Sequence, residues 1–143
     1  MDYLKDLNKK QVDARSIIEE LLSGKKYYFA ELKPSELEAC PGVYAIFDKD
    51  SGENLYVGRT KNLRQRLYTN HLMGSMANAR LKKYLVEDKD PCMTNIVSMD
   101  DAKQFLKDHC YFQCIQVEDV KRRGQIEGML SFFLDVRYMH EEH

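Results

Sequence analysis

The chain has 143 residues, of which 43% are hydrophobic, enough for one compact domain with a core and too few for two. Its 22 Lys and Arg stand against 23 Asp and Glu, a formal net charge of −1, which argues against a generic polyanion-binding protein. The N-terminal residues are charged, and no apolar run approaches the roughly 20 residues of a membrane span, so we expect a cytoplasmic protein with no membrane contact.

The first expected element is an amphipathic helix over Asn8–Leu22. Apolar residues recur in it at helical spacing, and Gly24 stands just past its end, where glycine is favoured. Further on, Ser35–Glu38 has the spacing of a capping box. It predicts a short helical turn that Pro41 and Gly42 terminate.

Two short β-prone runs follow, Val43–Phe47 and Leu55–Val57. The intervening residues 48–54 have the composition of a turn, so an antiparallel hairpin is expected. Thr60 or Asn62 can then cap a helix.

That helix is expected to run from Leu63 through Tyr68 toward His71, with a second helical piece around Ala77–Val86. We find no clear pattern in Pro91–Met99. A short helix capped by an aspartate is expected over Asp100–Lys107.

The last two expected elements are a strand over Tyr111–Val117 and a helix over Gln125–Tyr138 that carries an apolar stripe. The order of elements predicts an α/β (α+β) fold, with a small three-stranded antiparallel sheet flanked by helices. Residues 1–40 would form an N-terminal helical extension packed on a domain that covers 41–143.

Basic residues are concentrated in one part of the chain. Seven of them and no acidic residue lie between positions 59 and 83: Arg59, Lys61, Arg64, Arg66, Arg80, Lys82 and Lys83. Such a stretch can dock a phosphate backbone even when the net charge is near zero. A solvated helix face is the alternative.

The four cysteines, Cys40, Cys92, Cys110 and Cys114, are irregularly spaced and are expected to be reduced thiols. Cys110 and Cys114 lie near His109, which raises the possibility of zinc. The spacing matches no common finger and no second ligand pair is present. A zinc-stabilised interaction domain is therefore a weaker alternative.

The ordered set Gly42-Val43-Tyr44, Tyr56-Val57-Gly58, Arg66 and Glu127 resembles the GIY-YIG nuclease family. The resemblance spans about Pro41 to Tyr138. It implies a small sheet in which both tyrosines lie on one face of the hairpin, with the glycines allowing close backbone approach.

The resemblance also implies roles for individual residues in hydrolysis of a phosphodiester bond. Tyr44 would act as or near the general base, and Tyr56 would position the water or the phosphate. Because an ordinary phenol has a pKa of about 10, nearby cations or metal-linked water would have to lower the pKa of Tyr44. Arg66 and Arg59 would bind phosphate oxygens. Glu127 would hold one divalent ion, Mg²⁺ or Mn²⁺.

Residues around these would contact nucleic acid: Gly58, Thr60, Lys61, Arg64, Asn70, His71, Arg80, Lys82 and Lys83. Taken singly, each candidate has an ordinary structural interpretation, such as a strand aromatic or a surface charge. The joint spacing favours function.

Two features depart from the family pattern. Many relatives have histidine four residues after the helix arginine, where this chain has Asn70, followed by His71. His71 can substitute only if the helix ends or bulges there. The proline and asparagine that commonly follow the metal-binding glutamate are replaced by Val136 and Met139, which puts catalytic competence in doubt.

The leading hypothesis is a metal-dependent DNA endonuclease, in DNA repair or restriction, with DNA as partner and a homodimer or a separate targeting protein as further possibilities. The alternative is a catalytically degenerate module of the same fold that binds nucleic acid or protein. The sequence does not predict which DNA target is recognised.

Overall fold

The centre of the computed structural model, which describes residues 1–73, 80–93 and 95–139, is an antiparallel sheet. Its strand order is β1-β4-β2-β3, and its strands are β1 (Tyr27–Tyr28), β2 (Gly42–Asp48), β3 (Asn54–Thr60) and β4 (Cys110–Gln116). The predicted mixed α+β fold is confirmed, but the prediction of three strands was wrong by one.

The missed strand, β1, is only two residues long and carries no strand pattern of its own. Tyr27 lies opposite Phe112 in β4, and their rings stack with centroids 5.1 Å apart. The strand therefore depends on a contact with a segment more than 80 residues away, which local propensity cannot reveal.

The alternation of side chains along β2 divides the core into two layers. Val43, Ala45 and Phe47 pack on one face of the sheet, and Tyr44 and Ile46 pack on the other. All five are buried, so both faces of the central strand are covered.

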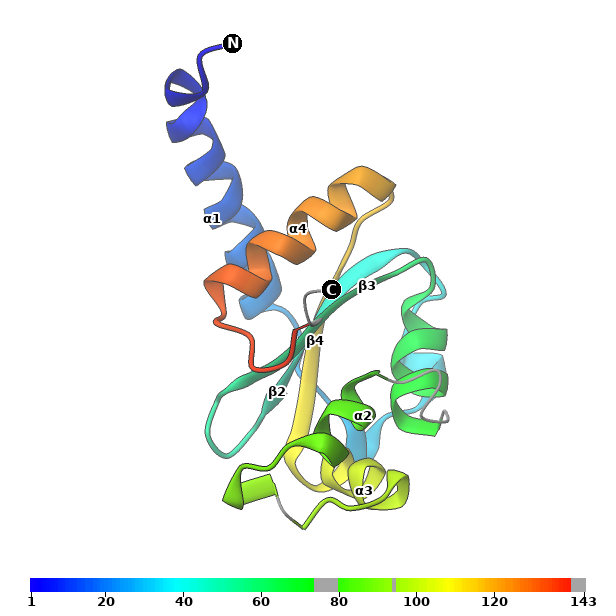
Figure 1. Cartoon of the computed structure of the whole chain (residues 1–143). Coiled ribbons are helices and arrows are strands. Elements are labelled where there is room, and N and C mark those ends of the chain that lie inside the picture. Colours follow the sequence, from blue (N-terminus) through cyan, green and yellow to red (C-terminus); the bar gives the residue numbers. More distant parts are fainter. Residues whose placement is uncertain (74–79, 94, 140–143) are drawn as a thin grey trace.

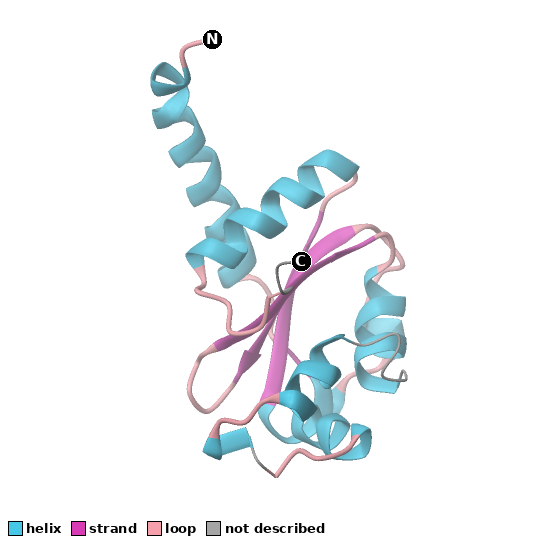
Figure 2. Cartoon of the chain, viewed as in Figure 1, coloured by secondary structure: helices cyan, strands magenta, loops and turns pink. Residues whose placement is uncertain are grey.

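Helices cover the two faces separately (Figures 1 and 2). The Val43 face packs against α1 (Leu7–Ser23) and α4 (Val120–Phe133). The Tyr44 face packs against a π-helix (Gln65–Met73), α2 (Arg80–Glu87) and α3 (Met99–His109). Short 3₁₀ turns complete the described chain at Tyr3–Asp6, Phe29–Glu31, Pro34–Glu36 and Pro91–Met93.

Within the described ranges, no helix has both the length and the apolar character that a bilayer crossing requires.

Several predicted helix ends were misplaced because the capping residue differs. The turn expected at Ser35–Glu38 lies at Pro34–Glu36, where the Glu36 carboxylate accepts from the Lys33 N–H at 3.1 Å. The cap of α3 is Ser98, not an aspartate; its hydroxyl accepts from the Asp101 N–H. Helix α4 begins at Val120, five residues early, and ends at Phe133.

The start of α4 is fixed by Asp119, whose carboxylate accepts from the Arg122 N–H at 2.8 Å. Arg123, on the first turn, is buried and donates to the carbonyls of Val117 and Glu118. These bonds join the helix to the end of β4.

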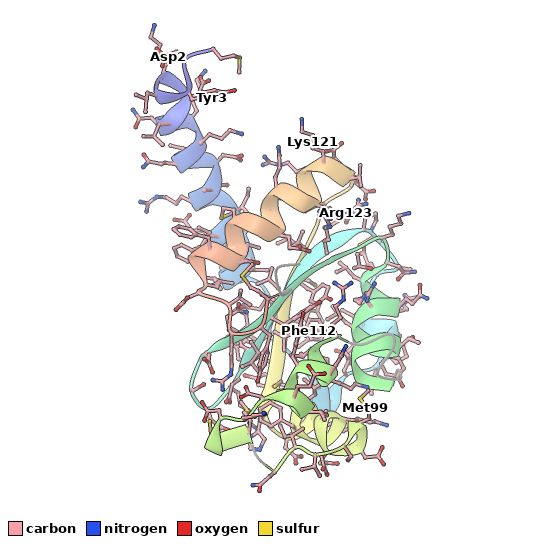
Figure 3. The ribbon with its side chains drawn as sticks, in the orientation of Figure 1. Asp2, Tyr3, Met99, Phe112, Lys121 and Arg123 are labelled. Carbon is pink, nitrogen blue, oxygen red and sulfur yellow. The ribbon has the colours of Figure 1, made fainter. Side chains whose placement is uncertain are left out.

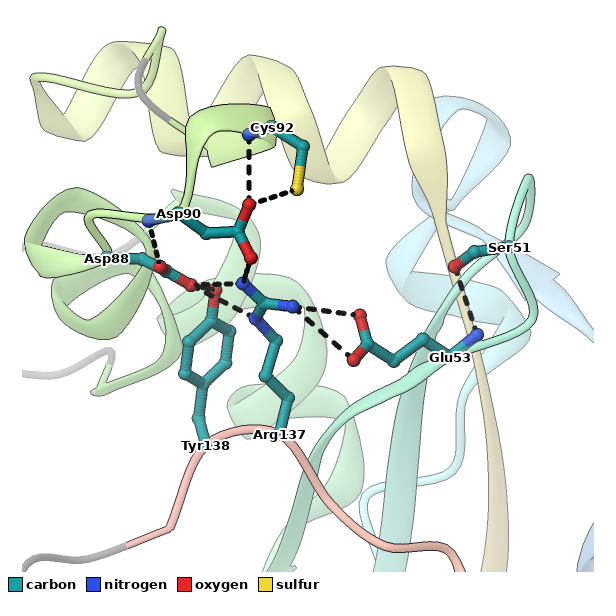
Figure 4. Close-up of polar contacts among 7 residues, drawn as sticks. All are labelled: Ser51, Glu53, Asp88, Asp90, Cys92, Arg137 and Tyr138. Atoms are coloured by element: carbon teal, nitrogen blue, oxygen red, sulfur yellow. Dashed lines mark hydrogen bonds and ion pairs between the residues drawn. The ribbon is translucent and has the colours of Figure 1, made fainter.

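The segment after α4 is held against the edge strand β3. The N–H groups of Arg137 and Tyr138 donate to the carbonyls of Asn54 and Leu55. The Arg137 guanidinium bonds to Asp88 at 2.9 Å and to Asp90 at 3.1 Å, and also reaches Glu53 (Figure 4). We call Arg137 with these three carboxylates the C-terminal clamp.

The contacts in this clamp lower the pKa values of Asp88 and Asp90. The hydrogen bonds from Cys92, and then Arg137, lower the pKa of Asp90 to about 2. Burial acts to raise the pKa of Asp88, but hydrogen bonds from Tyr138, Asp90 and Arg137 outweigh it, so that pKa is also lowered.

We expect Arg137→Met to destabilise the fold by about 1.5 to 3 kcal/mol, the usual value for lost hydrogen bonds to charged groups, because Asp88 is only 12% exposed and loses its cationic partner. The matched control is Arg122→Met. Its pair with Asp13 is about 40% exposed on each side, so its loss should destabilise the fold less. Chemical denaturation at neutral pH measures both, and equal losses would contradict the clamp.

The clamp also predicts a pH dependence of stability. Carboxylates with lowered pKa stabilise the fold above their unfolded pKa of 3.8, and this contribution is lost as the pH falls toward about 2. The decline between about pH 4 and 2 should be shallower in Arg137→Met than in the parent protein, measured by thermal unfolding across that range.

Candidate functional site

The two motif tyrosines lie on one face of the hairpin, as the sequence predicts. In the register of β2 and β3, Tyr44 pairs with Gly58 and Ile46 pairs with Tyr56. Because residues two apart in a strand share a face, Tyr44 and Tyr56 are diagonal neighbours. Their ring centroids are 6.3 Å apart with an interplanar angle of 31°. Tyr44 is buried and Tyr56 is half-buried.

Gly58 leaves the space that the Tyr44 ring occupies. A Cβ atom at position 58 would lie 2.3 Å from the Tyr44 hydroxyl oxygen and 2.4 Å from Cζ. The ring is rigid and buried, so it cannot give way as a flexible side chain could. Gly58, predicted as a nucleic-acid contact, therefore has a packing function.

Arg59 and Glu127 meet between β3 and α4. Arg59 Nε lies 3.9 Å from Glu127 Oε2, and the two side chains are 55% and 31% exposed. The Arg59 guanidinium lies against the α4 backbone at Gly124, where a Cβ would be 2.2 Å from its Nη1. This is a loose, solvent-accessible pair. The Glu127 carboxylate is therefore accessible to a ligand.

Arg66 lies at the start of the π-helix and lines a pocket between the end of β3 and the start of α4. The pocket has a volume of about 460 Å³, and it is lined by Arg59, Thr60, Lys61, Asn62, Gln65, Arg66, Val120 and Arg123. The Nε of Arg66 is buried and has no hydrogen-bond partner among the described atoms. Since an unpaired buried donor is costly, it marks a place where an anion would be stabilised.

The turn that shapes this pocket is built by two polar side chains. The Thr60 hydroxyl accepts from the Asn62 N–H at 3.0 Å. The Asn62 side chain accepts from the Gln65 N–H at 3.0 Å and caps the helix. Both were predicted as cap candidates, and Asn62 is the cap.

Burial dominates the chemistry of the tyrosines. It raises the pKa of Tyr44 well above its ordinary value of 10.0; Tyr56 and Glu127 add to this effect, whereas Arg66 and Arg80 oppose it. Burial likewise raises the pKa of Tyr56, with Arg80 opposing. The protein's own cations therefore do not outweigh burial, the pKa of Tyr44 stays above its ordinary value, and both phenols are protonated at neutral pH.

Glu127 is the acidic residue whose charge reaches both phenols. Among the described residues, no group of three or more His, Cys, Asp or Glu side chains forms a metal site. A single accessible carboxylate fits a hard cation that takes its other ligands from water and phosphate, as Mg²⁺ does. The donor set therefore suits one Mg²⁺ or Mn²⁺ and does not suit zinc.

The basic stretch does not form one uniform surface. Lys61, Arg80 and Lys83 are exposed. Arg64 is also exposed, and its Nε donates to the Leu37 carbonyl at 2.8 Å, which ties the helix start to the N-terminal segment.

Lys82 contradicts the prediction of a nucleic-acid contact, because it is only 1% exposed. Burial lowers its pKa to about 8, and Lys103 on α3 acts in the same direction. A side chain with so little exposure is not available to a phosphate backbone.

Asn70 and His71 lie on the π-helix, but their side chains fall outside the described part of the structure. In a π-helix the hydrogen bonds join residues five apart, so position 71 follows Arg66 by one such turn. The backbone therefore departs from a regular α-helix at His71. Such a departure is the condition under which His71 could take the place of the family's histidine.

The two residues at the family's proline and asparagine positions have different environments. Val136 packs against the core of the Val43 face. Met139 is 63% exposed. Between them, Arg137 and Tyr138 hold the segment to β3.

The zinc alternative finds no support in the described residues. The His109 Nδ1 lies 2.9 Å from the Asp50 carboxylate. Burial raises the pKa of Cys110 and raises that of Cys114 to about 11, which keeps both thiols protonated. All four cysteines are free, as predicted.

Sequence reasoning missed Gln65, Val120 and Arg123 as pocket residues. Arg123 is the informative one. It is buried at the base of α4 and bonded to two carbonyls (Figure 3). Its spacing of three residues from Ile126 places both on one helix face, which was the available signal.

Comparison with protein families gives one match, the GIY-YIG catalytic domain, over residues 40–111. That range includes Tyr44, Tyr56, Arg59 and Arg66 but ends before α4 and Glu127. No curated protein matched the chain.

Among solved structures, the chain is similar to the GIY-YIG N-terminal endonuclease domain of UvrC from Thermotoga maritima. One point mutant of that domain, bound to its catalytic divalent cation, aligns at 17% identity and a TM-score of 0.40, over 76% of this chain and 92% of the other. A second such mutant aligns at 17% identity and a TM-score of 0.37, over 73% and 88%.

We expect Gly58→Ala to destabilise the protein by about 1 to 3 kcal/mol, the usual cost of overpacking a core, because the new methyl group displaces the Tyr44 ring. Gly128→Ala is the control: nothing lies within 4 Å of its added Cβ, and it should be neutral or stabilise α4 by up to about 1 kcal/mol. Chemical denaturation measures both. A neutral Gly58→Ala would show that the ring is not confined.

Proposed function

Because this chain belongs to the GIY-YIG catalytic domain family, we propose that it is a divalent-metal-dependent endonuclease that hydrolyses phosphodiester bonds of DNA. The observation that carries the proposal is the proximity of four groups from separate elements. The rings of Tyr44 and Tyr56 lie 6.3 Å apart, Glu127 lies 3.9 Å from Arg59 at the end of β3, and the charges of Arg66 and Glu127 act on the pKa of Tyr44 in opposite directions. Separate elements bring them together, as a reaction centre requires.

Arg66 supports the binding of the scissile phosphate. Its guanidinium lines the basic pocket and has an unsatisfied Nε, and a planar guanidinium can bind two phosphate oxygens at once. Lys61 and Arg59 line the same pocket. Together they would stabilise the charge that develops on the phosphate in the transition state.

The tyrosines would place and deprotonate the attacking water. Their high pKa values make both phenols hydrogen-bond donors before substrate binds. Tyr56 would hold the water, and Tyr44 would accept its proton once nearby positive charge favours the phenolate. Glu127 would hold Mg²⁺ or Mn²⁺, and a bound ion supplies a Lewis acid that favours such deprotonation and neutralises a phosphate oxygen.

DNA would extend from this pocket over the exposed cations Lys61, Arg80 and Lys83. The division into an extension over 1–40 and a catalytic domain over 41–143 stays a prediction, as do a cytoplasmic location and a role in repair or restriction. The alternative function, binding without cleavage, has one observation in its favour: Met139 stands exposed where relatives carry the bracing asparagine.

We expect Glu127→Gln to reduce Mg²⁺-dependent nicking of supercoiled plasmid by about a hundredfold or more, because metal stabilisation of the transition state is worth several kcal/mol. Arg66→Met should cause a loss of similar size through the phosphate. Glu20→Gln, an exposed change on α1, is the matched control and should cut like the parent protein.

Cutting that survives both substitutions would exclude the proposed mechanism. If the parent protein leaves plasmid and branched DNA uncut with Mg²⁺ and with Mn²⁺ yet binds them in a salt-sensitive way, the catalytically degenerate module is the correct reading.

A second prediction concerns which lysines meet DNA. Lys61→Ala should lower the slope of log affinity against log salt by about 1, the effect of one lost phosphate contact. Lys82→Met should leave that slope unchanged because Lys82 is buried. Fluorescence anisotropy with a labelled duplex at several salt concentrations measures both, and an equal fall in slope for Lys82→Met would contradict its buried position.

A further inference from the structure

The N-terminal half of α1 projects beyond the body of the protein. In Figures 1 and 3 the helix runs past α4, and Tyr3 stands at its far end. Every residue from 1 to 12 is exposed. A helical segment this short gains little stability on its own in water. Burying its exposed apolar side chains against a partner would stabilise it.

The exposed apolar side chains belong to a heptad spacing. Its positions, alternately three and four residues apart, are Leu4, Leu7, Gln11, Ala14, Ile18 and Leu21, which correspond to successive a and d positions of a coiled coil with one polar member. Leu4 is 82% exposed and Leu7 is 49% exposed, whereas Leu21 is fully buried in the domain. The seam is therefore covered at one end and open at the other.

A groove beside the covered end is open to solvent. It has a volume of about 860 Å³ and is lined by the seam residues Gln11, Ala14 and Ile18 together with Phe132 and Phe133 at the end of α4. Phe132 is 88% exposed. One chain thus carries both a protruding apolar ridge, Leu4 and Leu7, and an apolar groove.

We propose that a second copy of this chain covers the seam, with the two α1 helices antiparallel and the ridge of each copy in the groove of the other. Such an isologous contact buries both unmatched surfaces with one symmetric interface. This interface is separate from DNA cleavage and does not depend on the proposed nuclease activity.

The charges along the seam select the antiparallel arrangement. In a parallel pair, the residues flanking the seam at g and at the following e position meet across the interface. Here these are Lys10 and Arg15, a repulsive contact made twice. In the antiparallel pair Lys10 lies near Ile17 and Arg15 lies near Asn8 of the second copy.

The register follows from the layers of the antiparallel seam. Leu7 of each copy faces Ile18 of the other, and Gln11 faces the small Ala14. The two Gln11 side chains then lie close to the twofold axis, where an amide can both donate to and accept from its own copy. A single polar residue within a seam is a common determinant of register.

The first test is the mass of the full chain in solution by sedimentation equilibrium. The parent protein should show twice the 16.8 kDa of one chain. Leu7→Glu and Phe132→Glu should each raise the dissociation constant by about tenfold or more, because each places a charge in the apolar contact. Val97→Glu, at a residue 74% exposed outside the seam, should leave it unchanged.

A monomeric parent protein at concentrations of about 100 μM, where any dimer of micromolar Kd is complete, would overturn the proposal and assign the seam to another protein. So would a dimer that keeps its affinity in both Glu variants. Circular dichroism identifies any variant that fails to fold, and removal of the exposed residues 1–12 then serves as the second test, with loss of the dimer expected.

The second test is disulfide crosslinking in a Cys92→Ser background, which removes the exposed native thiol. The double variant Leu7→Cys with Ile18→Cys should form a covalent dimer under mild oxidation, and neither single variant should. These two positions are eleven residues apart on one helix, about 16 Å, so they cannot join within a chain. Crosslinking of Leu7→Cys alone would show a parallel pair and overturn the arrangement.

Discussion

The packing of the Tyr44 ring over Gly58 is the contact on which the candidate site depends. The ring is buried, and its hydroxyl lies where a side chain at position 58 would have to begin. Gly58 in β3 and Tyr44 in β2 therefore form a single unit across the hairpin. The contact fixes the hydroxyl beside the edge strand, within electrostatic reach of Arg66, Arg80 and Glu127.

The electrostatics follow from this burial. A phenol removed from water keeps its proton more firmly, so Tyr44 and Tyr56 are neutral donors. Arg66, whose charge acts on both phenols, also lines the pocket that contains Arg59, Lys61 and Arg123. Cations near these neutral phenols attract an anion. They do not by themselves convert either phenol into a base. In the proposed mechanism, deprotonation of Tyr44 would therefore require further positive charge, which a cation held by the accessible carboxylate of Glu127 would supply.

Much of the fold could be predicted because helices and strands follow from the local spacing and type of apolar residues. The β-prone run Val43–Phe47 located a strand, and the spacing of apolar residues located α4. The errors arise from tertiary contacts. Strand β1 exists because Tyr27 stacks on Phe112, and Lys82 is buried because α3 packs over it; a run of basic residues cannot distinguish that from an exposed face. The tyrosines shared a face as predicted, whereas their raised pKa values required knowledge of burial depth.

Helix α4, which carries Glu127, shows how the structure accommodates its departures from the family pattern. At its start, Arg123 bonds to the carbonyls of Val117 and Glu118. In its middle, the Arg59 guanidinium lies on the backbone at Gly124.

Beyond its end, backbone bonds from Arg137 and Tyr138 to β3 and the C-terminal clamp fix the chain. Arg137 can therefore supply the bracing that a proline and an asparagine at positions 136 and 139 would otherwise provide. The clamp acts through charge and not through a rigid ring or an amide, so its contribution depends on the ionisation of Asp88 and Asp90, whose pKa values are both lowered.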